Sequence, residues 1–447
     1  MIKVAAMGQQ ATNDGTRQAG RSLIMSTIIG GAGAIVGWQL LSITPQLSIY
    51  ALIVLVAGLV MGPRIFKGPG MHAHADTWSY ALLTMIVILA PAVMDGIGGT
   101  PAGIMSAVAA GRLGASVILL EPSYLIGGLM SGGLHKTDIG KRETIGGLSA
   151  EFFRRVMDFY TMTYGATSPQ VKALDYTQDP KTRGGYYFEP KIALQIFREM
   201  LAEAGVTVRT KEQLQSVDAV AGLIRGLVTR HYETGAETRF TGTVFIDGSY
   251  EGDLMAQAGV LYRVGREARA EYQESLAGLT EGPAEYLGTG DHRVQSYNVR
   301  STISVDPNNR VPIPKPKHYF RDAHAHLIAT VNAHGLKRLV ELYPDRDRWA
   351  EINGKLDPNK ADFIGTNLGY SEGDYEQRAR ITARVQDYWL SHWYMLQNDP
   401  ALPEDFKADA RRYGLPKDEY LESNHVTPQI FVLRKAVAAR VRLEVLR

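Results

Sequence analysis

The chain has 447 residues, enough for two or three domains with a large core. Its 48 basic and 46 acidic side chains leave a formal net charge of +2, and no basic patch interleaved with aromatic residues appears, which argues against a nucleic-acid-binding surface. The absence of cysteine excludes disulfides, thiolate metal sites and redox-active dithiols, and it fits a reducing compartment.

The first part of the chain contains long apolar runs. Residues 23–42 and 47–62 carry no charged side chain, and arginine or lysine residues flank both. A membrane-spanning helix needs about 20 mostly apolar residues, so the first run qualifies, and the second qualifies if it starts near residue 43. The pattern predicts two transmembrane helices whose basic ends face the cytoplasm. A buried hairpin of a soluble protein is the alternative.

A third apolar run, residues 78–94, has two interpretations. As a third span it would place everything after Asp95 outside the cytoplasm; otherwise its end should form the first strand of the next domain. Pro91 and Gly96 make that lead-in a poor central strand, because buried parallel strands are normally continuous β-branched runs. The sequence leaves two and three spans open, and it indicates a junction of unrelated sequences near residues 94–97.

A glycine turn, a helix and a strand follow at residues 98–121. The turn reads Gly98-Gly99-Thr100-Pro101-Ala102-Gly103, and the apolar strand 116–121 ends in Glu121. Glycines let the backbone approach a pyrophosphate, and a helix that starts near Pro101 directs its free N–H groups and dipole at phosphates. Glu121 stands where ribose hydroxyls are held. This order predicts the first half of a Rossmann-like dinucleotide-binding unit.

Two further stretches carry possible cofactor contacts. The pair Gly127-Gly128 lies just past the ribose-binding strand, and contact of its backbone with a flat ring is favoured over a flexible loop. Asp247 follows an apolar strand and opens the turn DGSYEGDL. Its carboxylate is expected to reach a ribitol or phosphate-linked hydroxyl; the alternative is a capped start of the helix that follows, and both can hold at once.

The remaining elements up to residue 265 alternate between helices and strands. Amphipathic spacing predicts helices over 147–165 and 191–204, and a short strand over 206–209. Three further strands, over 214–220, 223–232 and 238–246, read as an antiparallel meander.

The last part of the chain is richer in aromatic residues, prolines and charges, as expected of a second domain. Arg300 is a candidate for neutralising a substrate carboxylate or steadying a reduced ring, and Lys355 and His425 are candidates for proton transfer. An ordinary surface or loop role is the alternative for each. His72 and His74 have no carboxylate at metal-ligand spacing, so the sequence predicts no metal site.

Several motifs occur in a fixed order from about residue 97 to about residue 435. They are GGTPAGIMSAVAAGRLGASVILLEP, IGGLMSGGL, GGYYFEPKIAL, VFIDGSYEGDLMAQAGV, VQSYNVRSTISVDPNNRVPIPKP and NGKLDPNKADFIGTNLGY. With these motifs the stretch resembles the FAD-dependent oxidoreductase family of bacterial flavoproteins. The resemblance implies an α/β fold, FAD at the glycine turn and a substrate or cap domain. The expected cofactor-binding residues are Gly98, Gly99, Thr100, Ala102, Gly103, Glu121, Gly127, Gly128 and Asp247.

Both ends of the chain depart from this family. Residues 1–95 resemble the transmembrane part of fusaric-acid-resistance-type aromatic acid exporters in their alternation of short apolar spans. In the flavoprotein family the chain returns to the nucleotide domain with a final strand and a helix that faces the flavin. Here residues 428–436 begin a helix and the chain stops at Arg447. We therefore expect the closing FAD-binding segment to be missing and, since the first strand is also poor, FAD to be held weakly or not at all.

The sequence predicts a membrane-like helical segment over 1–95, a Rossmann-like FAD-binding domain over 96–265 and a substrate or cap domain over 266–447. The expected function is transfer of a hydride or electron pair between a small organic substrate and FAD. One alternative is a membrane-anchored or fused, truncated flavoprotein or transporter-like fragment without catalysis. Another is an NAD-dependent dehydrogenase. The expected location is the membrane, through the apolar spans, with the flavin domain in the cytoplasm.

Overall fold

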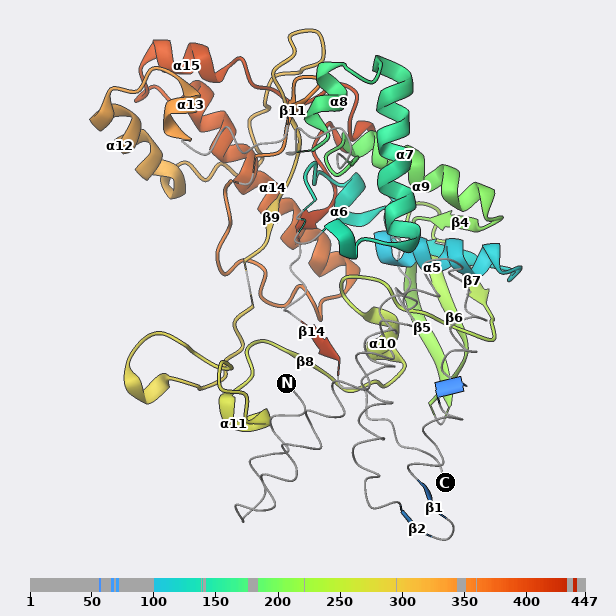
Figure 1. Ribbon diagram of the computed structural model, residues 1–447. Coiled ribbons are helices and arrows are strands. Elements are labelled where there is room, and N and C mark those ends of the chain that lie inside the picture. Colours follow the sequence, from blue (N-terminus) through green and yellow to red (C-terminus); the bar gives the residue numbers. More distant parts are fainter. Residues whose placement is uncertain are drawn as a thin grey trace. The chain divides into compact units, whose positions relative to one another are not determined.

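The structure is a computed structural model that divides the chain into two units (Figure 1). One unit comprises residues 1–95, 141–150 and 267–290, and the other comprises 96–140, 151–266 and 291–447. The structure describes residues 56–57, 66–67, 70–71, 100–137, 139, 142–175, 184–220, 222–294, 296–343, 351–358, 360–431 and 437–439. The division into three domains predicted from the sequence stays a prediction.

The described part of the first unit contributes mainly short elements. β1 (Phe66–Lys67) and β2 (Gly70–Met71) form an antiparallel hairpin, and α11 (Arg269–Tyr272) is a single helical turn. The 3-10 helices η3 (Arg142–Thr144) and η4 (Ala284–Tyr286) also belong to it. Within the described ranges no helix combines the length and apolarity that crossing a membrane requires. The predicted spans fall almost wholly on residues outside those ranges.

The second unit begins with the helix and strand that the glycine turn predicts. α5 (Pro101–Arg112) leads to β3 (Ile118–Glu121), which pairs in parallel with β4 (Thr207–Thr210). Parallel pairing requires a crossover connection, and here it runs through helices. These helices are α6 (Gly128–Ser131), α7 (Gly147–Tyr164), α8 (Pro169–Ala173) and α9 (Pro190–Glu203).

The helices pack on one another through a core of their own. α9 buries residues 192, 193, 196, 197, 200 and 201, the spacing that gives one apolar helix face. The ring of Phe152 on α7 stacks on that of Phe197 on α9, with centroids 4.5 Å apart. A Cβ at Gly111 would lie 2.3 Å from the carbonyl oxygen of Ala204, so glycine is what allows α5 to approach the end of α9.

The predicted meander is present, with one correction. β5 (Glu212–Val220), β6 (Leu223–His231) and β7 (Glu237–Phe240) form an antiparallel sheet in that order. The third strand was expected to continue to residue 246, but its pairing with β6 stops where Phe240 faces Leu227. The side chain of Val244 is 73% exposed, and among the described residues no strand pairs with 241–246. An apolar run without a partner strand does not form a strand.

The rest of the second unit is built from helices joined by very short strand pairs. β8 (Tyr262–Val264) pairs with β14 (Val437–Ala439), and β9 (Asn298–Val299) pairs with β13 (Ile430–Phe431). The helix expected from residue 428 is therefore wrong at Ile430 and Phe431. The other elements are α10 (Asp253–Gln257), β10 (Ile303–Ser304), η5 (Asp322–His324), α12 (Ala325–His334), α13 (Leu339–Leu342), β11 (Glu351–Ile352), β12 (Lys355–Leu356), α14 (Tyr375–Asn398), α15 (Glu404–Ala410) and η7 (Leu421–Ser423).

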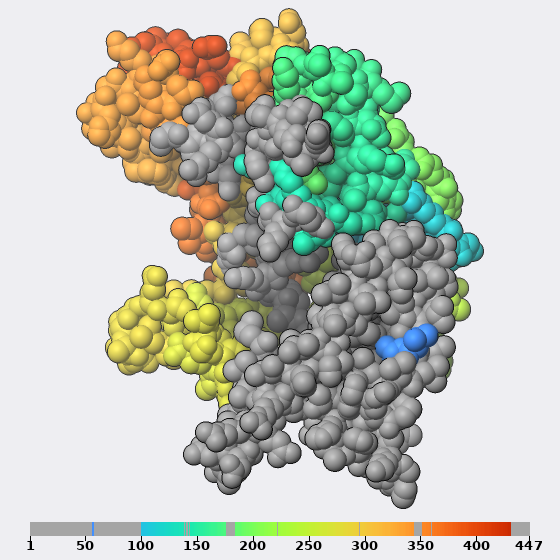
Figure 2. Space-filling model, viewed as in Figure 1, coloured from blue at the N-terminus to red at the C-terminus, as the bar shows by residue number. Residues whose placement is uncertain are grey.

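The long helix α14 lies at the centre of a second core. Asp374 caps its start by accepting a hydrogen bond from the Gln377 N–H at 2.7 Å. Trp389 and Trp393 are fully buried along one face, and Phe406 of α15 joins the same cluster. Side chains of α12, α13 and α15 form one continuous lobe, orange to red, on the face shown in Figure 2. This core fixes the segments that carry Arg300 and Lys355.

Candidate functional site

Thr100 organises the start of α5. Its hydroxyl oxygen accepts a hydrogen bond from the Gly103 N–H at 3.3 Å, and the same hydroxyl donates to the Gly248 carbonyl oxygen at 2.7 Å. The Ile104 N–H donates to the Thr100 carbonyl oxygen. Thr100 is therefore both the N-cap of α5 and the link to the segment that Asp247 opens.

The first turn of α5 keeps one N–H group for a ligand. Pro101 has no N–H, and Thr100 satisfies those of Gly103 and Ile104, so among the described residues the Ala102 N–H is the first-turn donor that remains. With the positive end of the helix dipole, this donor suits an anionic group. Gly98 and Gly99 lie outside the described residues.

Glu121 ends β3 beside this turn. One of its carboxyl oxygens accepts a hydrogen bond from the Ser123 N–H at 2.8 Å. Burial raises the pKa of Glu121 to about 7, and the negative charge of Glu251 adds to the rise. A carboxyl that is partly protonated near neutral pH can accept from ribose hydroxyls or donate to them.

Glu251, whose charge acts on Glu121, also lines a polar cavity of about 800 Å³. The cavity lies against the meander strands, α10 and the start of α14, and its size is within the roughly 300–1,000 Å³ of small-ligand sites. Asp253 and Arg378 form a two-pronged ion pair at its wall, with N–O distances of 2.5 and 2.7 Å. The hydroxyl of Tyr375 accepts a hydrogen bond from the Leu214 N–H. The lining thus includes five carboxylate and three tyrosine side chains, beside two arginines.

The glycine-rich loop after β3 is held by residues far along the chain. Gly127 and Gly128 have φ values of +98° and +50°, and the Leu129 N–H donates to the hydroxyl oxygen of Tyr250 at 3.0 Å. A Cβ at Gly128 would lie 2.4 Å from that hydroxyl oxygen. A Cβ at Gly133 would lie 1.9 Å from the backbone oxygen of Arg300. The described neighbours therefore leave this loop no room for side chains at these positions.

Asp247 directs its carboxylate into its own turn. One oxygen accepts from the backbone N–H and the hydroxyl of Ser249, and the other accepts from the Met255 N–H at 2.8 Å. These contacts agree with the helix-capping interpretation, and contact of Asp247 with the cofactor stays a prediction. Asp247 lies next to Gly248, which is bonded to Thr100, so the structure brings the turn and the glycine motif together.

Arg300 is committed to a buried ion pair. Its Nε and Nη2 atoms donate to the two carboxylate oxygens of Asp357 at 3.0 and 2.7 Å, and the side chains are 12% and 2% exposed. A bidentate pair of this kind fixes the guanidinium in one orientation. Arg300 therefore presents a held, largely neutralised cation.

Lys355 lies in a buried ionic cluster. Its Nζ atom is 2.8 Å from Glu189, 2.9 Å from Asp418 and 2.8 Å from Glu419, and the side chain is fully buried. Burial lowers the pKa of Lys355, but the carboxylates of Glu419 and Glu189 outweigh it and the pKa is raised. Because such an ammonium group keeps its proton, the geometry favours a structural role over proton transfer.

His425 touches the edge of the same cluster. Its Nδ1 atom lies 3.2 Å from the backbone oxygen of Glu419, and its φ is +67°. The structure thus brings Lys355 and His425 to one residue, while Arg300 pairs elsewhere.

His135 is a buried residue that sequence reasoning missed. Its Nε2 atom lies 2.8 Å from the Thr302 hydroxyl, which in turn lies 3.2 Å from the Tyr420 hydroxyl. Burial lowers the pKa of His135 to about 3, and the charges of Lys355 and Arg300 add to the effect. A signal was available, since His135 follows the second glycine pair, Gly132-Gly133, with one residue between them.

The sequence of the chain matches a family profile described as FAD dependent oxidoreductase over residues 97–432, more than half of its length. No curated protein matches. The match starts at residue 97, so it gives no support to the exporter resemblance of the first 95 residues.

Solved structures show only remote likeness. A myxobacterial chondrochloren halogenase, CndH, described as a variant of FAD-dependent halogenases, is 18% identical over 38% of this chain and 40% of its own, with a TM-score of 0.27. A glycerol-3-phosphate dehydrogenase from Bacillus halodurans complexed with FAD is 15% identical over 44% of this chain and 47% of its own, with a TM-score of 0.25. The 3-ketosteroid-delta4-(5alpha)-dehydrogenase from Rhodococcus jostii RHA1 is 14% identical over 38% of this chain and 55% of its own, with a TM-score of 0.22.

The chain thus spans about half or less of these structures, and the assignment rests on the family profile. FAD is the cofactor that the profile and the predicted motifs share. The chain belongs to the FAD dependent oxidoreductase family.

Proposed function

We propose that this chain transfers a hydride or an electron pair between a small organic substrate and FAD. The observation that carries the proposal is the hydrogen bond from the Thr100 hydroxyl to the Gly248 carbonyl oxygen. It joins the phosphate-type helix start to the turn at Asp247, and β3 delivers Glu121 next to the Glu251 cavity. Two motifs about 150 positions apart thereby form one candidate dinucleotide site.

The charges and hydrogen-bonding groups of the residues present complement those of FAD. The Ala102 N–H and the dipole of α5 suit the pyrophosphate, and Glu121 suits the hydroxyls of the ribose. The cavity beside Glu251 is rich in carboxylates and tyrosine hydroxyls, which suit the amino and hydroxyl donors of adenosine and disfavour further phosphates. When bound, FAD supplies the redox chemistry.

The protein's own contribution is to bind, orient and fix charge. The glycines of the loop, Gly127, Gly128 and Gly133, let its backbone pack closely against Tyr250 and Arg300, which fixes the position of the loop. Arg300 stays the candidate for a substrate carboxylate or a reduced ring, with its orientation fixed and its charge largely balanced by Asp357. His135, kept neutral by its surroundings, holds Thr302 and through it Tyr420.

The test is a titration of the purified full chain with FAD, followed by quenching of flavin fluorescence. We expect saturable binding that Thr100→Val weakens and Thr100→Ser retains. Thr163→Val is the matched control, because Thr163 donates to its own helix at Phe159 on the exposed face of α7. Equal losses in Thr100→Val and Thr163→Val would overturn the placement of FAD.

Experiments on the FAD-bound protein then distinguish the proposed oxidoreductase from the alternative functions. Bleaching of the flavin bands by a small organic substrate without oxygen supports the oxidoreductase. Saturable FAD binding with no bleaching across a broad panel of alcohols, amines and acids favours the non-catalytic flavoprotein. Binding of NAD in preference to FAD supports the dehydrogenase alternative and contradicts the proposal.

A further inference from the structure

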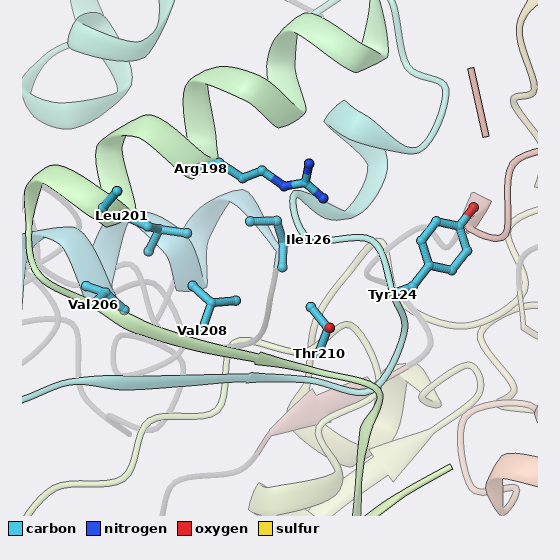
Figure 3. A pocket seen from close by; sticks show the side chains of 8 residues that line it. Tyr124, Ile126, Arg198, Leu201, Val206, Val208 and Thr210 are labelled. Atoms are coloured by element: carbon cyan, nitrogen blue, oxygen red, sulfur yellow. The ribbon is translucent and has the colours of Figure 1, made fainter. Parts of the chain in front are cut away.

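A separate pocket of about 230 Å³ lies between α9 and β4 (Figure 3). Its walls are mostly apolar and come from Leu201 on α9, Val206 and Val208 on or beside β4, and Ile126 in the loop after β3. Neither Glu121 nor any residue of α5 lines it, although Thr210 pairs with Glu121 and Ile126 precedes Gly127, so the pocket neighbours the proposed FAD site without sharing these residues.

Among the described residues that line this pocket, Arg198 is the charged one. Arg198 lies on α9 one turn before Leu201, and its side chain extends along the pocket toward Tyr124 in Figure 3. Throughout the described part of the chain no residue forms a hydrogen bond or ion pair with Arg198. A guanidinium group has five N–H donors in a planar fork that matches a carboxylate. An unpaired one at an apolar pocket is a ready partner for an anion.

The rest of the lining supports an anion with an apolar body. None of the described residues that line the pocket is acidic. Thr210 and Tyr124 add two hydroxyl-bearing side chains to the lining, and the Tyr124 hydroxyl is held 2.8 Å from the Ser423 hydroxyl. The aliphatic side chains of Ile126, Leu201, Val206 and Val208 form most of the remaining walls.

The volume limits the size of the occupant. At about 30 Å³ per water, 230 Å³ corresponds to roughly eight non-hydrogen atoms. We propose that this pocket binds a small carboxylate with a short apolar body, with its carboxylate on Arg198 and its carbon chain against Leu201 and Val208. Inorganic anions lack the apolar body, and neutral or cationic analogues lack the charge.

The experiment measures binding of hexanoate to the full chain by calorimetry, with hexan-1-ol, hexylammonium and inorganic phosphate as comparison ligands. We expect hexanoate to bind with a Kd on the order of millimolar, and the other three to bind at least about tenfold more weakly. Arg198→Gln should weaken hexanoate binding about tenfold or more, and Val208→Trp should abolish it by filling the pocket.

The controls keep the outcome decisive. Arg154→Gln changes another exposed helical arginine that does not line the pocket, and it should leave hexanoate binding unchanged. Thermal unfolding of each variant shows that it is folded. Equal binding of hexanoate and hexan-1-ol, unchanged binding in Arg198→Gln, or equal losses in Arg198→Gln and Arg154→Gln would overturn the proposal.

Discussion

The Thr100 hydroxyl and the Gly248 carbonyl oxygen are 2.7 Å apart although 148 positions separate them in the sequence. The same hydroxyl caps α5 through the Gly103 N–H. One side chain therefore couples the stability of a helix start to the placement of the turn that follows the meander. Several measurable consequences follow from this and neighbouring contacts.

Thr100→Val should lower the free energy of unfolding by about 1–2 kcal/mol, because it removes an N-cap and a partly buried hydrogen bond at once. FAD affinity should fall about tenfold with it, since Ala102 loses its fixed orientation. Chemical denaturation and FAD titration measure the two effects. Wild-type stability in Thr100→Val would contradict the link.

Glu121→Ala should weaken FAD binding more than Glu251→Ala does, because Glu121 is the carboxyl assigned to the ribose. A fluorescence titration of both variants decides the matter. Equal effects would remove the ribose assignment.

The stability of the fold should depend on pH through Glu121. Its pKa rises from the ordinary 4.5 to about 7 in the folded state, so between those values the folded chain keeps a proton that the unfolded chain has lost. Its contribution is therefore largest below about pH 4.5 and is lost as pH rises through 7, by up to roughly 3 kcal/mol.

Glu121→Gln should remove that part of the pH dependence measured by urea unfolding from pH 5 to 8. Glu251→Gln should move it to lower pH, since the negative charge of Glu251 helps raise the pKa of Glu121. A pH profile in Glu121→Gln identical to that of the natural chain would show that Glu121 titrates normally.

Lys355→Met should destabilise the protein by about 3–5 kcal/mol, because it leaves Glu189 and Glu419 buried without their cation. Lys191→Met is the matched control: Lys191 pairs with the same Asp418 but is 39% exposed, and its loss should cost no more than about 1 kcal/mol. The double change Lys355→Met with Glu419→Gln should recover part of the loss. Equal costs at the two lysines, read by denaturant unfolding, would refute the buried cluster.

Gly133→Ala should prevent normal packing, because its Cβ would lie 1.9 Å from the Arg300 carbonyl oxygen and its φ is +121°. Gly165→Ala offers a control with φ +88° and nothing within 4 Å, so it carries backbone strain alone, about 1 kcal/mol. The difference between the two melting temperatures isolates the contact with Arg300. A Gly133→Ala variant as stable as Gly165→Ala would contradict it.

The sequence predicted local elements well where local chemistry decides them. α5 and α9 begin at Pro101 and Pro190, where proline suits a first helical turn, and both were expected to within a residue or two. The prediction of a strand over 241–246 was wrong because strand formation depends on a partner strand, which no local pattern reveals. The helix predicted at the position of β13 is wrong for the same reason, because the residues of β9 that pair with it lie about 130 positions earlier.

The site followed the same division. Motif order predicts that the turn at Asp247 lies near the first glycine motif, and the Thr100–Gly248 hydrogen bond agrees with it, while the cofactor roles of Glu121 and Asp247 stay predictions. The partners of Lys355 were not, because Glu189, Asp418 and Glu419 lie 166, 63 and 64 positions away and carry no spacing signal. These ion pairs favour a structural role for Lys355, which the sequence had made a candidate for proton transfer.

The hydroxyl of Thr427 donates to the Gly132 carbonyl oxygen at 2.7 Å, across 295 positions. At roughly 5–20 residues per second, the ribosome makes Thr427 at least about 15 s after Gly132. The glycine-rich loop therefore lacks its hydrogen bond from Thr427 while most of the chain is still being synthesised. We expect cofactor loading to follow translation, with the nascent nucleotide half depending on chaperones in the interval.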